Sequence, residues 1–268
     1  MKKWIKKEIS KEDVFNLSKK YSIDSLTASV CARRGITKGE DLVFFLEDDL
    51  RFLHNPFLFN QMEDAVDRIL DAKEEGEKVL IFGDRDVDGI TSTTILYEYL
   101  NSIGIDVEYR VPMGDESYGL TIEVIDDFAK NYGTLIITVD NGISNINEIK
   151  YASELGIDII VTDHHTPQEV LPEPAIIINP KTSDSGYPFA HISGCAVAFK
   201  LIQALRFSQT ELYKQDICLL NAYENENGAT LECVKLHNNL EKERFCLENI
   251  NEGLKISDTK LETFLRGQ

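Results

Sequence analysis

The sequence lacks any apolar run long enough to cross a membrane, since no stretch approaches the ~18 residues that a spanning helix needs. The N-terminal segment MKKWIKKEISKED is basic, but no apolar segment follows it, which excludes a secretory signal. The cysteines form no C-x-x-C pair, so neither a zinc ribbon nor a disulfide framework is expected. We therefore expect a cytoplasmic protein without membrane contact. The five scattered cysteines are Cys31, Cys195, Cys218, Cys233 and Cys246.

The chain also lacks an excess of positive charge. It has 28 Lys and Arg against 46 Asp and Glu, a net charge of −18 over 268 residues, which disfavours a protein that simply wraps nucleic acid. Residues 1–38 are the exception, with ten basic and four acidic side chains. This basic segment is either a solvated helical face or a contact for a polyanion. A hydrophobic share of 43% with 28% charged residues is typical of a globular protein.

Hydrophobic periodicity divides the chain into three parts. Residues 1–76 are expected to be helical, with the apolar positions of 65–70 at helical spacing. Residues 77–207 alternate short apolar strands with helices of about ten residues, which predicts an α/β domain whose parallel sheet has helices on both faces. Residues 208–268 show no clear period; residues 223–228 are expected to form a loop. The expected strands are 79–82, 105–111, 135–139, 157–161 and 175–178, and the expected helices are 91–100, 121–130, 145–155 and 195–205.

Carboxylates and histidines follow three of these apolar strands. Ligands bind beyond the carboxyl ends of the strands in an open α/β sheet, so we expect these side chains to converge. Crowded carboxylates repel one another and raise each other's pKa, and a divalent cation removes that cost. Mixed carboxylate and imidazole ligands suit Mn²⁺, and Mg²⁺ fits because oxygen donors dominate. The residues are Asp84, Asp86 and Asp88 after the first strand, Asp140 after the third, and Asp163, His164 and His165 after the fourth.

Each of these motifs is weak when taken alone. An isolated D-x-D-x-D is often a calcium loop or an exposed turn, and an isolated His-His pair is often a surface feature. An EF-hand is disfavoured because the twelfth position counted from Asp84 is Ile95 rather than a bidentate acid. Their shared placement at strand ends of one sheet favours a metal site with two ions.

Four segments contain or flank these strand ends: IFGDRDVDGITSTTILYEYL, LIITVDNGIS, DIIVTDHHTP and IIINPKTSDSGYPFAHISGCAVAFKLI. Together they resemble the DHH phosphoesterases, and within them the RecJ-type exonucleases specific for single-stranded DNA. The stretch from Cys31 to Asp84 is similar to the helical segment that precedes the first motif of that branch. The resemblance covers roughly residues 25–207 and implies two Mn²⁺ or Mg²⁺ ions that support phosphoester hydrolysis.

The resemblance also implies roles for individual residues. Asp84 and Asp86 would serve one metal ion. Asp88 and His164 would serve the other, and Asp140 would bridge both. The implied remaining roles are His165 near the scissile phosphate, Asp163 as a support, and Asp140 and His165 as catalytic residues. Ser193 and Gly194 open a helix that either binds a phosphate through its free N–H groups or is simply capped there.

Three features depart from the family's pattern. Arg85 stands where a neutral residue is usual, and it would shield the carboxylates or touch phosphate. A further ligand in an Ala-Asp-Val-like stretch is missing; counting from Asp216 places Asn225 there, and Asp216 and Glu226 are substitutes to consider. The glycine- and histidine-rich motif of a second domain is also missing, which suggests the N-terminal part of a larger or split protein that downstream domains or a second chain complete.

The function expected from this resemblance is metal-dependent 5′→3′ hydrolysis of phosphodiester bonds in single-stranded DNA. Two alternatives stay open. One is a small-substrate DHH phosphoesterase, such as an oligoribonuclease, a cyclic-dinucleotide phosphodiesterase or a pyrophosphatase. The other is a non-catalytic DHH scaffold. The long helical segment before the first motif disfavours the former, and the full set of aspartates and histidines disfavours the latter.

Overall fold

The computed structural model describes residues 5–47, 49–225, 228–250 and 264, and the chain divides into two compact units at His54. The N-terminal unit contains the helices α1 (Lys11–Tyr21), α2 (Ser25–Arg34) and α3 (Gly39–Leu46) and the 3₁₀ turn η1 (Leu50–Phe52). Ser10 and Asp24 begin α1 and α2 by accepting hydrogen bonds from the free N–H groups of the first turn. The helices bury Leu17, Ala28, Cys31 and Leu42 between them.

The second unit is built on a five-stranded parallel sheet, as the sequence predicts. Its strands are β1 (Lys78–Phe82), β2 (Asp106–Arg110), β3 (Gly133–Val139), β4 (Asp158–Thr162) and β5 (Ile176–Ile178). The spatial order is β2-β1-β3-β4-β5, and every neighbouring pair is parallel. Strands β1, β3 and β4 are central and almost continuously apolar because both of their faces are covered.

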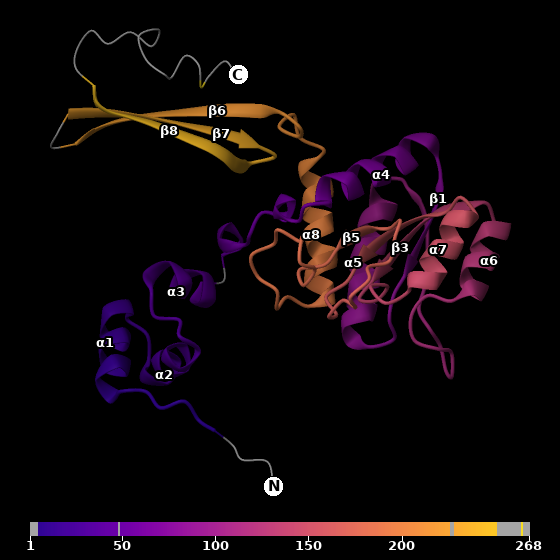
Figure 1. The fold of residues 1–268 in the computed structure, drawn as a ribbon, viewed down its shortest axis with the longest axis horizontal. Coiled ribbons are helices and arrows are strands. Elements are labelled where there is room, and N and C mark those ends of the chain that lie inside the picture. Colours follow the sequence, from indigo (N-terminus) through magenta and orange to yellow (C-terminus); the bar gives the residue numbers. More distant parts are fainter. Residues whose placement is uncertain (1–4, 48, 226–227, 251–263, 265–268) are drawn as a thin grey trace. The chain divides into compact units, whose positions relative to one another are not determined.

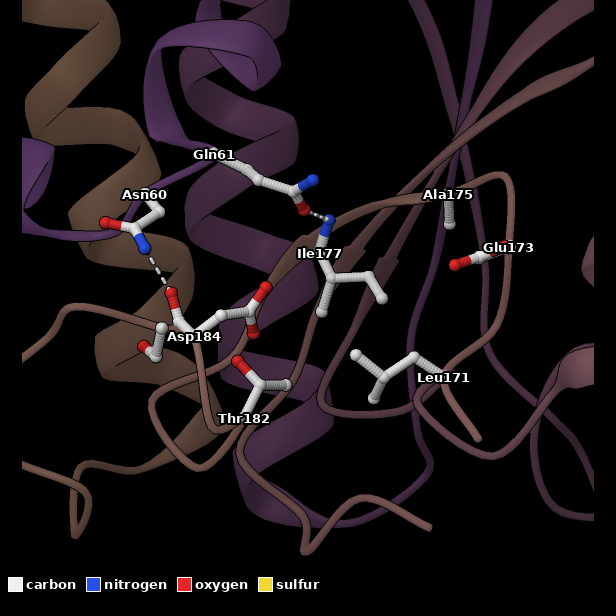
Figure 2. A pocket seen from close by; sticks show the side chains of 9 residues that line it. Asn60, Gln61, Leu171, Glu173, Ala175, Ile177, Thr182 and Asp184 are labelled. Carbon is white, nitrogen blue, oxygen red and sulfur yellow. Dashed lines mark hydrogen bonds between the residues drawn. The ribbon is translucent and has the colours of Figure 1, made fainter. Parts of the chain in front are cut away.

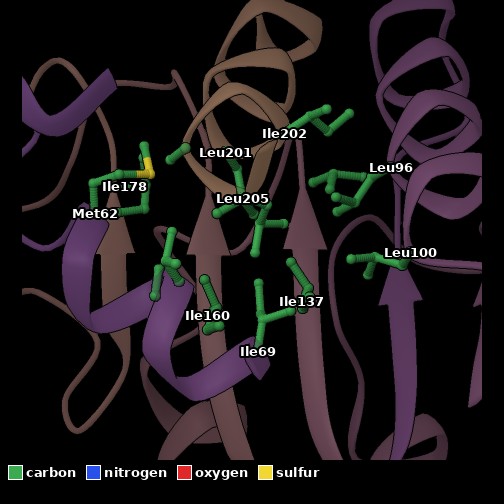
Figure 3. Packing of buried hydrophobic residues seen from close by; sticks show 14 of the residues in the cluster. Met62, Ile69, Leu96, Leu100, Ile137, Ile160, Ile178, Leu201, Ile202 and Leu205 are labelled. Carbon is green, nitrogen blue, oxygen red and sulfur yellow. The ribbon is translucent and has the colours of Figure 1, made fainter. Parts of the chain in front are cut away.

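Helices cover the two faces of this sheet (Figure 1). They are α4 (Met62–Glu75), α5 (Val87–Ser102), α6 (Ile122–Lys130), α7 (Ile146–Glu154) and α8 (Gly194–Phe207). Alternate strand residues face opposite sides. Val79 and Ile137 pack with α4, α5 and α8, as Figure 3 shows for Ile137, whereas Leu80 and Ile136 pack with α6 and α7. The fold class predicted from the sequence is therefore confirmed.

A three-stranded antiparallel sheet follows α8, in a part of the chain for which the sequence pattern predicted no structure. It consists of β6 (Asp216–Asn225), β7 (Gly228–His237) and β8 (Leu240–Ile250), in that order. The loop expected at 223–228 is wrong for Tyr223–Asn225, which belong to β6, and for Gly228, which begins β7. Asn238 and Asn239, both with positive φ, form the two-residue turn that joins β7 to β8. Consecutive asparagines are a hairpin signal that the periodicity analysis missed.

A side chain accepts one backbone N–H of β5, the strand at one edge of the parallel sheet. The N–H of Ile177 in β5 donates to Oε1 of Gln61 at 2.7 Å (Figure 2). Asn60 holds the segment 184–185 nearby, through hydrogen bonds to the carbonyls of Asp184 and Ser185. A small pocket of about 120 Å³ lies here. None of its lining residues is a predicted site residue.

Candidate metal centre at the strand ends

The first acidic group follows β1 at the point where α5 begins. Asp84 is buried, and its Oδ1 accepts the N–H of Arg85 at 2.7 Å. Asp86 caps α5 by accepting the N–H of Gly89 at 2.9 Å. A Cβ on Gly89 would lie 2.5 Å from the carbonyl oxygen of Asp84, so only glycine allows the helix to begin this close to the strand end.

Asp140 lies at the end of β3 in an unfavourable environment for a carboxylate. It is only 1% exposed, its backbone has φ of +60°, and its Oδ1 has no hydrogen-bond partner. Burial, and then the charges of Asp88 and Asp86, raise its pKa to about 7. Gly194 lies against it, because a Cβ there would collide with Oδ1 of Asp140. The protein thus retains a buried acid with an unused oxygen at the centre of the site.

The turn after Asp140 fixes the position of this acid. The side-chain amide of Asn141 donates to the carbonyls of Val139 at 2.8 Å and Phe82 at 3.2 Å, which ties the end of β3 to the end of β1. Thr138 Oγ1 donates to the carbonyl of Asn141 at 2.9 Å. The Asp-Asn-Gly sequence therefore serves as a link between two strand ends.

Asp163 organises the third group of residues. Its Oδ1 accepts the N–H groups of His164 at 2.6 Å and His165 at 3.0 Å, and it contacts Nδ1 of His165 at 2.8 Å. Burial opposes ionisation of Asp163, but the bonds from His165 and from the Ile143 N–H hold its pKa below the ordinary value. The same hydrogen bond raises the pKa of His165. Asp163 thus orients the His165 ring from behind.

His164 faces two of the aspartates. Its Nδ1 lies 3.0 Å from the carbonyl of Ile192, an acceptor, so Nδ1 carries a proton. In the neutral ring, Nε2 then presents a lone pair, yet it lies 3.1 Å from Oδ1 of Asp140 and 3.6 Å from Oδ2 of Asp88. Facing lone pairs require a cation between them, either a proton or a metal ion. This arrangement is that expected of metal ligands.

The side chain of Asp88, a residue of α5, lies at the N-terminus of α8. Its two carboxylate oxygens accept the N–H groups of Gly194 and Cys195, each at 2.7 Å, while Ser193 caps the helix through Ala196. The N–H group of Gly194 that was expected to bind phosphate is therefore used by Asp88. A role of Ser193 and Gly194 in phosphate binding stays a prediction. It requires a donor other than the N–H groups of Gly194 and Cys195, which already bind Asp88.

Arg85 points to the loop after β2. Its guanidinium donates to the carbonyls of Gly114 at 2.9 Å and Glu116 at 2.6 Å, which uses two of its five N–H groups. The same loop carries Tyr118, which the sequence analysis did not single out. The Tyr118 hydroxyl lies 3.4 Å from the carbonyl of Asp140, and its ring meets that of His165 edge-to-face at 6.3 Å. Burial and the nearby aspartates raise the pKa of Tyr118.

The structure brings all five predicted metal ligands together. Ligand atoms of Asp84, Asp86 and Asp140 lie within 4.8 Å of one another, as do those of Asp140, His164 and His165, and Asp88 joins them through His164. Asp140 belongs to both groups. The substitutes considered for the missing ligand add nothing at the described residues: Asp216 pairs with His237 at 2.8 Å, and Glu226 lies outside them.

Comparisons with known proteins show which family the chain resembles. Residues 78–224 match the model of the DHH family, N-terminal domain. The chain is 36% identical over 204 residues to the single-stranded-DNA-specific exonuclease RecJ of Bacillus subtilis, covering 76% of this chain and 26% of the relative. It is 42% identical over 147 residues to RecJ of Escherichia coli, covering 54% of this chain and 26% of that protein.

A solved structure shows the same relationship. RecJ of Thermus thermophilus in complex with Mn²⁺ matches 74% of this chain and 27% of its own, at 28% identity and a TM-score of 0.57. The chain thus spans about a quarter of the length of these relatives. None of the described helices is both long and apolar enough to cross a membrane. Fold, strand-end residues and family match lead to one conclusion: this chain belongs to the DHH family.

Proposed function

We propose that this chain carries the phosphodiesterase centre of a RecJ-like 5′→3′ exonuclease that acts on single-stranded DNA with two Mn²⁺ or Mg²⁺ ions. The similarity to RecJ supports the reaction and the substrate. Five unpaired cysteines support a cytoplasmic location. The single observation that carries the proposal is the buried Oδ1 of Asp140, which has no hydrogen-bond partner and lies 3.1 Å from Nε2 of His164.

The residues present fit two divalent ions. Carboxylate oxygens and imidazole nitrogen suit Mn²⁺, and the excess of oxygen donors accommodates Mg²⁺. A cation would relieve both the unpaired Oδ1 of Asp140 and its repulsion from His164. When bound, such ions polarise a phosphoester and lower the pKa of a coordinated water. The proposed ligands are Asp84 and Asp86 for one ion, Asp88 and His164 for the other, and Asp140 for both.

The remaining residues would position the substrate and its protons. His165 would face the scissile phosphate with Nε2, because Asp163 holds its Nδ1 and favours the charged ring. A charged imidazole can donate to a phosphate oxygen or to the leaving alkoxide. Arg85 has three N–H groups beyond its two loop contacts, and a role of one of them in binding phosphate stays a prediction. Asp140 and His165 are thus the proposed catalytic residues.

The proposal also divides the chain into domains and includes parts beyond it that complete the DNA cleft. We divide the protein into a helical segment (1–76), a catalytic domain (77–207) and a C-terminal region (208–268). The relatives are about four times longer than the matched region, so the proposal includes downstream domains, or a second chain, that complete the DNA cleft. The net charge of −18 makes unaided capture of DNA weak.

Crystals soaked in Mn²⁺ test the centre directly. One or two anomalous peaks should lie within about 2.3 Å of the five proposed ligands. No peak at saturating Mn²⁺ would refute the metal centre.

Degradation of 5′-labelled single-stranded DNA tests the reaction, with Asp140→Ala as the control for contaminating nucleases. We expect slow, Mn²⁺-dependent release of nucleotides that the variant lacks. Metal binding without any hydrolysis, alone or with downstream domains supplied, would favour the non-catalytic scaffold. The missing Ala-Asp-Val-like stretch favours that second candidate. Hydrolysis of short oligonucleotides or cyclic dinucleotides alone would favour the small-substrate enzyme.

A further inference from the structure

Two cysteines meet in the antiparallel sheet, far along the chain from the strand-end residues. The Sγ atoms of Cys218 in β6 and Cys233 in β7 lie 2.7 Å apart. The register pairs Cys218 with Lys235 and Leu220 with Cys233, so the two cysteines are diagonal neighbours on the same face of the sheet. Their sulfurs are thus about 0.7 Å from the length of a disulfide bond.

The two thiols differ strongly in their surroundings. Cys218 is exposed on the edge strand, whereas Cys233 is fully buried on the central strand. Leu231, Phe245 and Phe264 pack around Cys233. Burial, and then the neighbouring Cys218, raise the pKa of the Cys233 thiol to about 12. Because only Cys218 is exposed, an oxidant from solvent meets it first. The Sγ of Cys233 lies 2.7 Å away, close enough to act as the resolving thiol once its proton is transferred to the leaving hydroxyl.

We propose that Cys218 and Cys233 form a peroxide-responsive dithiol that closes to a reversible disulfide between β6 and β7. A peroxide transfers one oxygen to the sulfur of Cys218, its O–O bond breaks, and a sulfenic acid and one water form. The sulfur of Cys233 then attacks the sulfur of Cys218. The S–S bond forms as the S–O bond breaks, and the Cys233 proton leaves with the hydroxyl as a second water. Two thiols lose two electrons, and the peroxide gains them.

The bond would fasten an edge strand to its neighbour. β6 begins where Lys214 and Tyr213 bind Asp67 of α4, and β7 ends where His237 contacts Glu63 of α4. A bridge between β6 and β7 joins these two attachments covalently. The modification would therefore add a covalent restraint between β6 and β7 during oxidative stress, and reduction would remove that restraint.

Cys246 is a matched control within the same sheet. It is exposed like Cys218, but it pairs with Glu232, so it faces the side of the sheet opposite Cys233. Exposure alone would make Cys246 as reactive as Cys218, yet it has no resolving thiol among the residues paired with it. The proposal therefore predicts a specific bridge, not general oxidation of exposed thiols.

The test treats the native full chain with hydrogen peroxide, blocks the remaining thiols, and maps peptides without reduction. We expect the free thiols to fall from five to three, with a Cys218–Cys233 peptide that dithiothreitol removes. Cys246→Ser should still form this peptide. Cys233→Ser should instead leave Cys218 as a sulfenic acid that dimedone traps. If Cys233→Ser does not fold, wild-type chain unfolded in urea replaces it and should give scrambled pairs.

Two results would overturn the proposal. One is thiol loss without the Cys218–Cys233 peptide, including bridges between molecules through Cys246. The other is retention of all five thiols at peroxide levels that oxidise the unfolded chain.

Discussion

Asp140→Asn should stabilise the protein without metal and remove its stabilisation by metal. The substitution keeps the shape of the side chain and removes its charge. In the wild type, burial and the neighbouring Asp88 and Asp86 raise the pKa of Asp140 from 3.8 to about 7. An acid whose pKa is raised on folding loses stability as pH increases between these two values. Above pH 7 the loss is about 4 kcal/mol, from 1.36 kcal/mol for each pH unit.

The neutral amide avoids this cost, so the difference in free energy of unfolding between the variant and the wild type should depend on pH. At pH 8 in EDTA we expect the free energy of unfolding of the variant to be about 2–4 kcal/mol higher than that of the wild type. At roughly 2–4 °C for each kcal/mol, its melting midpoint should rise by about 4–16 °C. The gain should shrink as pH falls from 7 towards 4 and vanish at about pH 3, below both pKa values, where the wild-type carboxyl is protonated in both states.

Manganese should remove most of the difference in stability between the two proteins. At an Mn²⁺ concentration 100 times its dissociation constant, the wild type should gain about 2.7 kcal/mol. The variant should gain little, since the side chain proposed to bind both ions is no longer an anion. Thermal melting by circular dichroism, in EDTA and in Mn²⁺, measures both effects.

Asp127→Asn on α6 is the matched control, because it removes an exposed carboxylate away from the site. This control should melt like the wild type in both conditions. The reasoning is refuted if Asp140→Asn is less stable than the wild type in EDTA at pH 8. It is also refuted if the variant keeps the full Mn²⁺-induced shift.

Three further predictions concern metal binding and stability. Gly194→Ala places a Cβ against Oδ1 of Asp140, so calorimetric titration should show Mn²⁺ affinity lowered at least tenfold; unchanged affinity would show that this approach is unimportant. Ile137→Ala opens a cavity in the fully buried core and should cost about 2–5 kcal/mol in urea unfolding, whereas a loss under 1 kcal/mol would indicate collapse of the cavity. Burial opposes ionisation of Glu77, but hydrogen bonds from Arg68 lower its pKa, so wild-type stability should fall as pH drops below 4.5, and Glu77→Gln should flatten this acid limb of the stability curve.

The sequence by itself determined the architecture of the parallel sheet. Strands covered on both faces must be apolar throughout, so runs such as 135–139 and 157–161 mark central strands without tertiary information. Because parallel strands end at the same edge, the acids and histidines after these runs were bound to meet. The resemblance to DHH proteins rests on the same segments, and the family match covers them.

Only the tertiary structure decided how these side chains face one another. The unused oxygen of Asp140 depends on its positive φ and on the close approach of Gly194, which comes from a helix about fifty residues later. The anchoring of Asp88 by the N-terminus of that helix has the same origin. Neither contact leaves a local pattern, because both join segments distant in the chain.

The antiparallel sheet is the second feature that the sequence pattern did not predict. Its strands β6–β8 carry many polar residues, and apolar pairs such as Leu219-Leu220 break their alternation, so period-2 analysis fails there. The Cys218–Cys233 pair was invisible for a further reason. Fifteen residues separate the two cysteines, and only the register of β6 against β7 turns that separation into a contact. Local composition specifies which residues prefer a strand, but strand register is set by the packing of the whole sheet.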